Sequence, residues 1–65
     1  MLKSEAEREV IRRWRELPKY QRSTGEQATA FATSLMEDIV FPTSGDRYHF
    51  IRGWLQRDLV LRPTV

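Results

Sequence analysis

Apolar side chains recur at helical spacing in three separate stretches of the chain. In the first stretch they repeat every three or four residues, which places them on one face of a helix. The members of this face are Ala6, Val10, Ile11, Trp14 and Leu17. Ser4 and Glu7 have the spacing of a capping box, and Pro18 cannot continue a helix. The pattern predicts a first helix over residues 4–17.

The second stretch carries a broader apolar arc. Its members are Ala28, Phe31, Ala32, Leu35, Met36, Ile39 and Val40. A second capping box is available from Ser23 with Glu26 or from Thr24 with Gln27. Pro42 marks the end, because the residue before a proline is biased away from helical backbone angles. We therefore expect a second helix over residues 24–41.

The third stretch follows a turn, Pro42-Thr43-Ser44-Gly45, after which Asp46 is a natural N-cap. Its apolar positions are Tyr48, Phe50, Ile51, Trp54, Leu55 and Leu59. These positions predict a third helix over residues 46–60. Residues 61–65 are expected to form a short flexible tail.

Three amphipathic helices joined by short polar connections predict one all-α domain over residues 1–65. The helices would pack as a small three-helix bundle or as an orthogonal three-helix arrangement. Trp14 and Trp54 belong to the predicted core. A chain of 65 residues buries only about 60% of its unfolded surface, so its stability is expected to be marginal. Without cysteine, oligomerisation is the common reinforcement that remains.

The residue inventory offers little for catalysis. The chain has no cysteine, one histidine (His49), no glycine-rich phosphate loop and no His-Glu-x-x-His pattern. We therefore expect no enzyme activity, no cofactor and no metal site. A domain of this size is also expected to lack the roughly 300 Å³ that a small-molecule substrate needs. The chain shows no membrane-length apolar run and no signal peptide, which favours a cytoplasmic location.

Charge is distributed unevenly along the chain, although the net charge is only +2. Residues 1–22 carry a balance of +3 and residues 46–65 one of +2, whereas residues 23–45 carry −3. The third helix has a donor-rich stripe opposite its apolar arc, and the first helix adds a second basic stripe. The members of this candidate nucleic-acid face are Arg47, His49, Arg52, Gln56, Arg57, Arg8, Arg12 and Arg15.

Two interpretations of these basic stripes stay open. Arg52 and Gln56 are residue types that read base edges in a major groove, which suits a helix-turn-helix-like DNA-binding protein. Gly53 in the same stripe would allow close approach of another backbone. The other interpretation is a solvated helix surface. It is favoured by the acidic second helix and by a turn from Phe41 to Gly45 that is long for a helix-turn-helix.

The second helix has a small and mostly uncharged face opposite its apolar arc. Its central residues are Thr29, Ala30, Thr33 and Ser34, which form a candidate partner face. Small side chains let another helix approach closely. The sequence therefore favours a non-catalytic interaction or regulatory protein that binds a protein partner or itself, with DNA binding through the third helix as the alternative.

Overall fold

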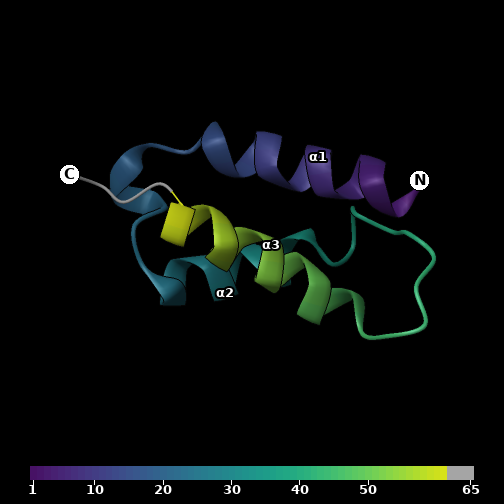
Figure 1. Cartoon of the computed structure of the whole chain (residues 1–65). Coiled ribbons are helices and arrows are strands. Elements are labelled where there is room, and N and C mark those ends of the chain that lie inside the picture. The colour runs from purple at the N-terminus through teal and green to yellow at the C-terminus, as the bar shows by residue number, and fades with distance from the viewer. Residues whose placement is uncertain (62–65) are drawn as a thin grey trace.

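The computed structural model describes residues 1–61, and within them the chain folds into three α-helices and one short 3-10 helix. The elements are α1 (Lys3–Arg15), η1 (Lys19–Gln21), α2 (Gly25–Leu35) and α3 (Arg47–Leu61). Figure 1 shows α1 and α3 running in one direction and α2 in the other. The predicted all-α three-helix fold is confirmed, in its bundle form. Leu61 ends α3, and the rest of the predicted tail lies outside the described residues.

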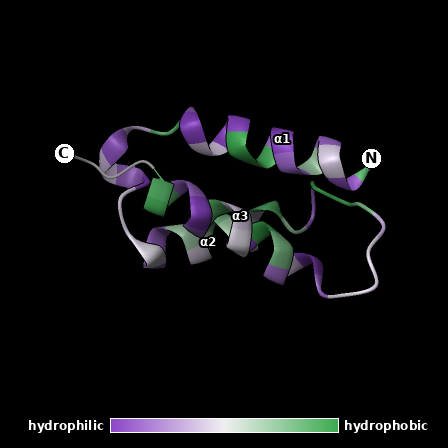
Figure 2. Cartoon of the chain, viewed as in Figure 1, coloured by the Kyte–Doolittle hydropathy of each residue, from purple (hydrophilic) through white to green (hydrophobic). Residues whose placement is uncertain are grey.

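The core is formed by one apolar cluster to which all three helices contribute. Its buried members are Ala6, Val10, Trp14, Ala28, Ala32, Leu35, Ile39, Phe41, Ile51, Trp54 and Leu55. Both tryptophans are in it, as predicted: Trp14 is 0% exposed and Trp54 is 7% exposed. The Trp14 ring packs against Phe31 of α2, with 5.4 Å between centroids. Hydrophilic and hydrophobic residues alternate along α1 in Figure 2, as this one-sided burial requires.

The end of the second helix differs from the predicted boundary at residue 41. α2 ends at Leu35, a turn follows, and the chain continues without helix towards α3. Ile39 and Phe41 are buried and Val40 between them is 57% exposed, which is the alternation of an extended segment. Ile39 and Val40 are β-branched and so favour helix weakly. Their spacing from Leu35 fits a helix equally well, which is why the pattern misplaced this boundary.

The helix starts confirm two of the predicted caps and correct one. Thr24 Oγ1 accepts from the Gln27 N–H at 3.1 Å, and Gln27 Oε1 accepts from the Thr24 N–H at 3.1 Å. Asp46 Oδ1 accepts from the Tyr48 N–H at 3.0 Å at the start of α3. The capping box predicted for Ser4 does not form, because α1 already begins at Lys3. Its first turn is closed instead by Glu5, which accepts from the Leu2 N–H.

Replacement of Trp14 tests the core directly. Trp14→Ala should lower the free energy of unfolding by about 3–5 kcal/mol, because the cavity it leaves is surrounded by three helices. A domain this small has little more stability than that, so the variant should be largely unfolded. Trp14→Phe should cost less, since Trp14 Nε1 has no hydrogen-bond partner among the described residues.

Urea denaturation followed by far-ultraviolet circular dichroism measures both effects. Val60→Ala is the control, because Val60 is 78% exposed and its loss should stay within about 0.5 kcal/mol. Equal stability of Trp14→Ala and Val60→Ala would contradict this description of the core.

Candidate functional site

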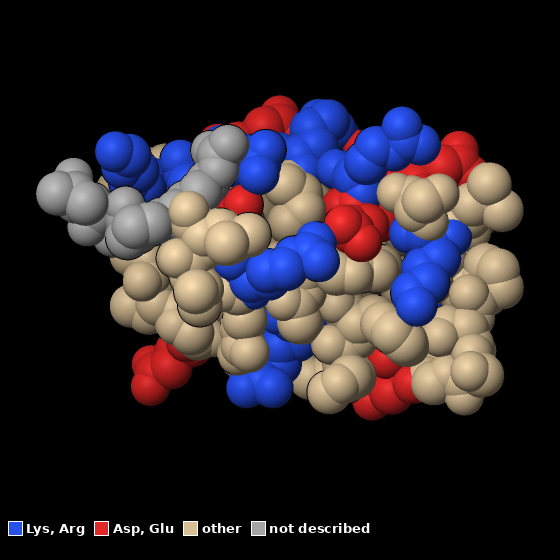
Figure 3. Space-filling view, in the orientation of Figure 1, with Lys and Arg blue, Asp and Glu red and all other residues tan. Residues whose placement is uncertain are grey.

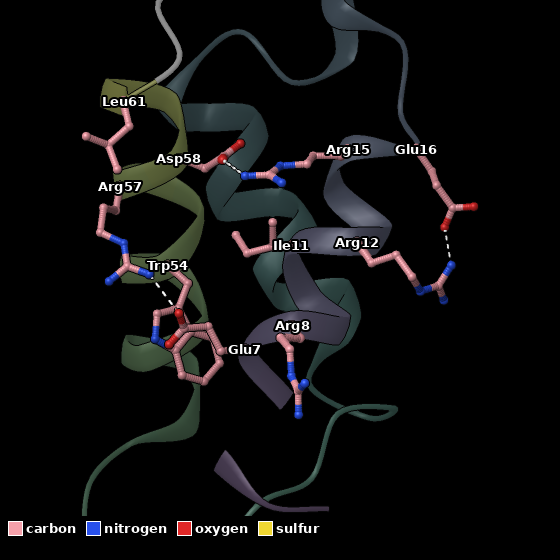
Figure 4. Close-up of a pocket in the computed structure, with 10 residues that line it drawn as sticks. All are labelled: Glu7, Arg8, Ile11, Arg12, Arg15, Glu16, Trp54, Arg57, Asp58 and Leu61. Atoms are coloured by element: carbon pink, nitrogen blue, oxygen red, sulfur yellow. Dashed lines mark hydrogen bonds and ion pairs between the residues drawn. The ribbon is translucent and has the colours of Figure 1, made fainter. Parts of the chain in front are cut away.

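A groove of about 530 Å³ lies between α1 and α3. It is lined by Glu7, Arg8, Ile11, Arg12, Arg15, Glu16, Trp54, Arg57, Asp58 and Leu61. Each α3 member of the lining has one other member three residues away and one four residues away, as Trp54 has with Arg57 and Asp58, so the four share one side of that helix. Figure 4 shows α2 lying behind the two helices when the groove is viewed from its open side. The expectation that so small a domain lacks a cavity of ligand size was wrong, because it considered enclosed pockets and not an open groove between parallel helices.

The floor of the groove is apolar. Ile11 lies between the two helices (Figure 4) and is half-buried, and Trp54 lines the groove from α3. Trp54 is held from below by Phe41, whose ring centroid is 5.4 Å away. Leu61 continues this apolar surface at the end of α3 and is 71% exposed. The floor is therefore rigid at Trp54 and open to solvent at Leu61.

Two ion pairs connect α1 with α3 across the groove (Figure 4). Arg15 Nη2 lies 2.9 Å from Asp58 Oδ1, and Arg57 Nη2 lies 2.8 Å from Glu7 Oε2. The Asp58 side chain is only 7% exposed, so its charge requires the guanidinium beside it. The pairs are reciprocal, since each helix supplies one arginine and one carboxylate. They hold two guanidinium groups at fixed places on the rim.

Arg12 is already engaged by acids of its own helix. Its guanidinium bonds both oxygens of Glu9, at 2.9 and 2.6 Å, and reaches Glu16 at 2.6 Å. Arg13 donates to the same Glu9 carboxylate at 2.7 Å. The hydrogen bonds from Arg12 and then Arg13 lower the pKa of Glu9 to about 2. Figure 4 shows Arg12 and Glu16 on the side of α1 away from α3.

Arg8 differs from the other arginines of the groove. Its side chain is exposed and makes no hydrogen bond or ion pair with residues 1–61 that would occupy its guanidinium. Its five N–H donors therefore have no acceptor among residues 1–61. On the face seen in Figure 3, basic side chains gather over α1 and α3 with acidic ones between them.

The candidate nucleic-acid residues separate into two groups in the folded chain. Arg8, Arg12, Arg15 and Arg57 line the groove, whereas Arg47, Arg52 and Gln56 are half-buried elsewhere on α3 and His49 is exposed. Arg47 Nη1 donates to the carbonyls of Met36, at 3.0 Å, and Ile39, at 2.8 Å. It thereby satisfies backbone acceptors just beyond the end of α2.

Arg52 also contacts α2. Its Nε donates to Thr29 Oγ1 at 3.3 Å, and the Gln56 amide oxygen, in the orientation that satisfies both groups, accepts from Arg52 at 3.1 Å. The two residues predicted to read bases are thus hydrogen-bonded to each other, and Arg52 is also hydrogen-bonded to α2. Neither residue lines the groove between α1 and α3.

The candidate partner face on α2 is also divided. Thr29 is half-buried beneath Arg52, whereas Ala30, Thr33 and Ser34 are exposed. The Thr33 hydroxyl donates to the Thr29 carbonyl at 3.0 Å, and the Ser34 hydroxyl donates to the Phe31 carbonyl at 2.7 Å. The exposed part therefore presents mainly methyl and methylene groups. Its role as a partner face stays a prediction.

The sequence reasoning missed the floor of the groove and the two carboxylates that cross it. Ile11 and Trp54 were assigned to the core and Leu61 to the tail. Asp58 carried a usable signal, because it is an acid next to the apolar arc of Trp54, Leu55 and Leu59. A carboxylate at such a position requires a cation from another element.

Substitution of Arg47 tests whether this residue stabilises the fold or is available to bind a ligand. Arg47→Ala should lower the free energy of unfolding by about 1–3 kcal/mol without any ligand, because two carbonyls lose their donor. Arg8→Ala is the matched control and should stay within about 0.5 kcal/mol. Thermal and urea unfolding measure both variants, and equal stability of the two would mean that the contacts of Arg47 are dispensable.

The low pKa of Glu9 predicts how the stability of the fold changes in acid. Because its folded pKa of about 2 lies below the ordinary value of 4.5, the stability it contributes is complete above pH 4.5 and is lost as the pH falls to about 2. Glu9→Gln should therefore flatten the dependence of unfolding free energy on pH in that window. Glu26→Gln, which removes an exposed acid of α2, is the control. An NMR titration of the Glu9 carboxyl with a midpoint near 4.5 would refute the assignment.

Within residues 1–61, no three histidine or acidic side chains lie together as metal ligands would, and none of the helices is long and apolar enough to cross a membrane. No protein-family model, no curated protein and no solved structure matches the chain. The case for a function therefore rests on the groove itself.

Proposed function

We propose that this chain is a non-catalytic interaction protein that holds a segment of a protein partner in the groove between α1 and α3. The observation that carries the proposal is the juxtaposition of an apolar floor with a rim of arginines. Apolar grooves between helices with a few placed charges are a recurrent mode of protein recognition. Arginine and tryptophan are also enriched among the residues that dominate binding energy.

The contacts within the groove support binding over catalysis. The carboxylates of Glu7, Glu16 and Asp58 each accept from an arginine. These bonds hold the two helices and their arginines in place. They do not set a carboxylate beside a nucleophilic side chain, as nucleophilic catalysis would need. A cytoplasmic location is part of the proposal, since a chain without cysteine needs no oxidising compartment.

Duplex DNA is the rival ligand, because four of the candidate nucleic-acid residues share this groove. Two observations favour protein. Arg47 and Arg52, which the DNA interpretation needs, are engaged with α2 and the segment that follows it. The accessible floor of the groove at Ile11 and Leu61 is apolar, which suits the apolar side chains of a protein better than a phosphate backbone.

A pair of matched substitutions tests the proposal. Leu61→Glu and Thr33→Glu each add one charge at an exposed position, the first at the groove and the second on the outer face of α2. We expect Leu61→Glu to reduce the amount of co-purifying partner at least tenfold, because it places a charge on the apolar floor. Thr33→Glu should leave it unchanged. Each tagged variant is purified from cells of the source organism, and the amount of co-purifying partner is measured by quantitative mass spectrometry.

Circular dichroism of both variants first establishes that they fold alike. Loss of the co-purifying partner with Thr33→Glu and not with Leu61→Glu would place the binding site on α2 and contradict the proposal. If the purified chain retains duplex DNA and Arg8→Gln abolishes this retention, the nucleic-acid function replaces the proposed protein binding.

A further inference from the structure

The shape of the groove fits one more helix. α1 and α3 run in the same direction, and α2 lies behind them (Figures 1 and 4). None of the other helices among residues 1–61 contributes to the lining of the groove. The lining residues of α3 run from Trp54 to Leu61, about two turns or 10 Å of helix. An apolar stripe at positions i, i+4 and i+7 of a docked helix has the same length. A fourth helix there would complete a four-helix bundle.

The rim of the groove retains unused hydrogen-bond donors. Arginine has five N–H donors. Arg15 and Arg57 each use one in the interhelical ion pairs, and their side chains remain 44% and 57% exposed. Arg8 uses none with the described residues. An incoming carboxylate can therefore be bound by these guanidinium groups while both ion pairs stay intact.

The two acids that pair across the groove lie deeper than the arginines they face. The Asp58 side chain is 7% exposed and that of Glu7 is 39% exposed, and each already faces an arginine. Glu16 is exposed but bound to Arg12 at the far edge of α1. A docked acidic side chain thus meets donors that the ion pairs leave open, and it meets the Arg8 guanidinium, which no acid among residues 1–61 engages. The lining holds four arginines and three carboxylates, so its net charge of +1 favours an anionic partner.

A second copy of this chain does not supply a matching helix. The exposed surface of α2 has Glu26 as its single charged residue, and α1 carries four arginines of its own. α1 also has glutamates beside Ala6 and Val10, but these apolar residues are 0% exposed in the core, so none of the described helices presents an exposed apolar stripe flanked by carboxylates. The occupant that complements the groove is therefore another protein.

We infer that the partner segment is an amphipathic α-helix whose apolar stripe is flanked by glutamates or aspartates, bound along Ile11, Trp54 and Leu61 with its carboxylates on Arg8, Arg15 and Arg57. This inference rests on the proposed function and adds the chemistry of the partner.

Two synthetic helical peptides of about 15 residues, long enough to form helix, serve as probes. Both carry leucine at i, i+4 and i+7, and the flanking positions are glutamate in one and lysine in the other. Binding to the full chain is measured by fluorescence anisotropy and by amide-shift NMR at about 0.15 M salt. We expect the glutamate peptide to bind at least tenfold more tightly and to shift amides of α1 and α3 around the groove.

Arg8→Gln should weaken binding of the glutamate peptide several-fold without altering the fold, because Arg8 has no internal partner among residues 1–61. Lys19→Gln removes the same charge from exposed η1 and should have no effect. Equal binding of the two peptides in the groove would overturn the acidic specificity and leave the proposed function standing. Absence of groove shifts with either peptide, or displacement of the glutamate peptide by duplex DNA, would overturn both.

Discussion

The ion pair between Asp58 and Arg15 is the contact on which the geometry of the groove depends. A carboxylate at 7% exposure loses most of its hydration and is stable only beside a cation. Arg15 provides that cation from the last turn of α1, 43 residues away in sequence. The pair fixes how α1 lies against the second half of α3. Because Arg57 and Glu7 repeat the arrangement with the roles exchanged, the separation of the two helices is set at two points.

The same constraint decides what the groove exposes. Carboxylates that hold helices together lie inside, and the arginines that satisfy them lie outside with donors to spare. Ile11 and Trp54 then form a floor between two fixed charges. Such an arrangement is organised before any ligand arrives, which lowers the conformational entropy lost on binding. Helix packing here thus produces a binding surface without a loop or a lid.

Local patterns predicted most of the fold. The spacing around Trp14 defined the buried face of α1, and the side chains of Thr24 and Asp46 marked the starts of α2 and α3, because caps and periodicity depend on neighbouring residues. The end of α2 was not predictable in this way. Ile39 continues the helical spacing of Leu35, but Phe41 packs on Trp54, and that tertiary contact selects an extended segment.

The candidate site was predictable only in part for the same reason. Arg8, Arg12 and Arg15 stand out as a basic stripe in the sequence, but their ion-pair partners do not. Glu7 and Arg57 are 50 residues apart, so only the packing of α1 on α3 brings them together. In the sequence Arg52 suits base reading and Arg47 suits phosphate contact, yet the position of α2 directs both to hydrogen-bond acceptors of the fold.

Intermolecular nuclear Overhauser effects between the labelled chain and an unlabelled acid-flanked helical peptide would locate the bound helix on the protein. We expect contacts from the peptide leucines to the methyl groups of Ile11 and Leu61 and to the Trp54 ring. Contacts to the methyl groups of Ala30 and Thr33 on α2 instead would contradict binding of the helix in the groove.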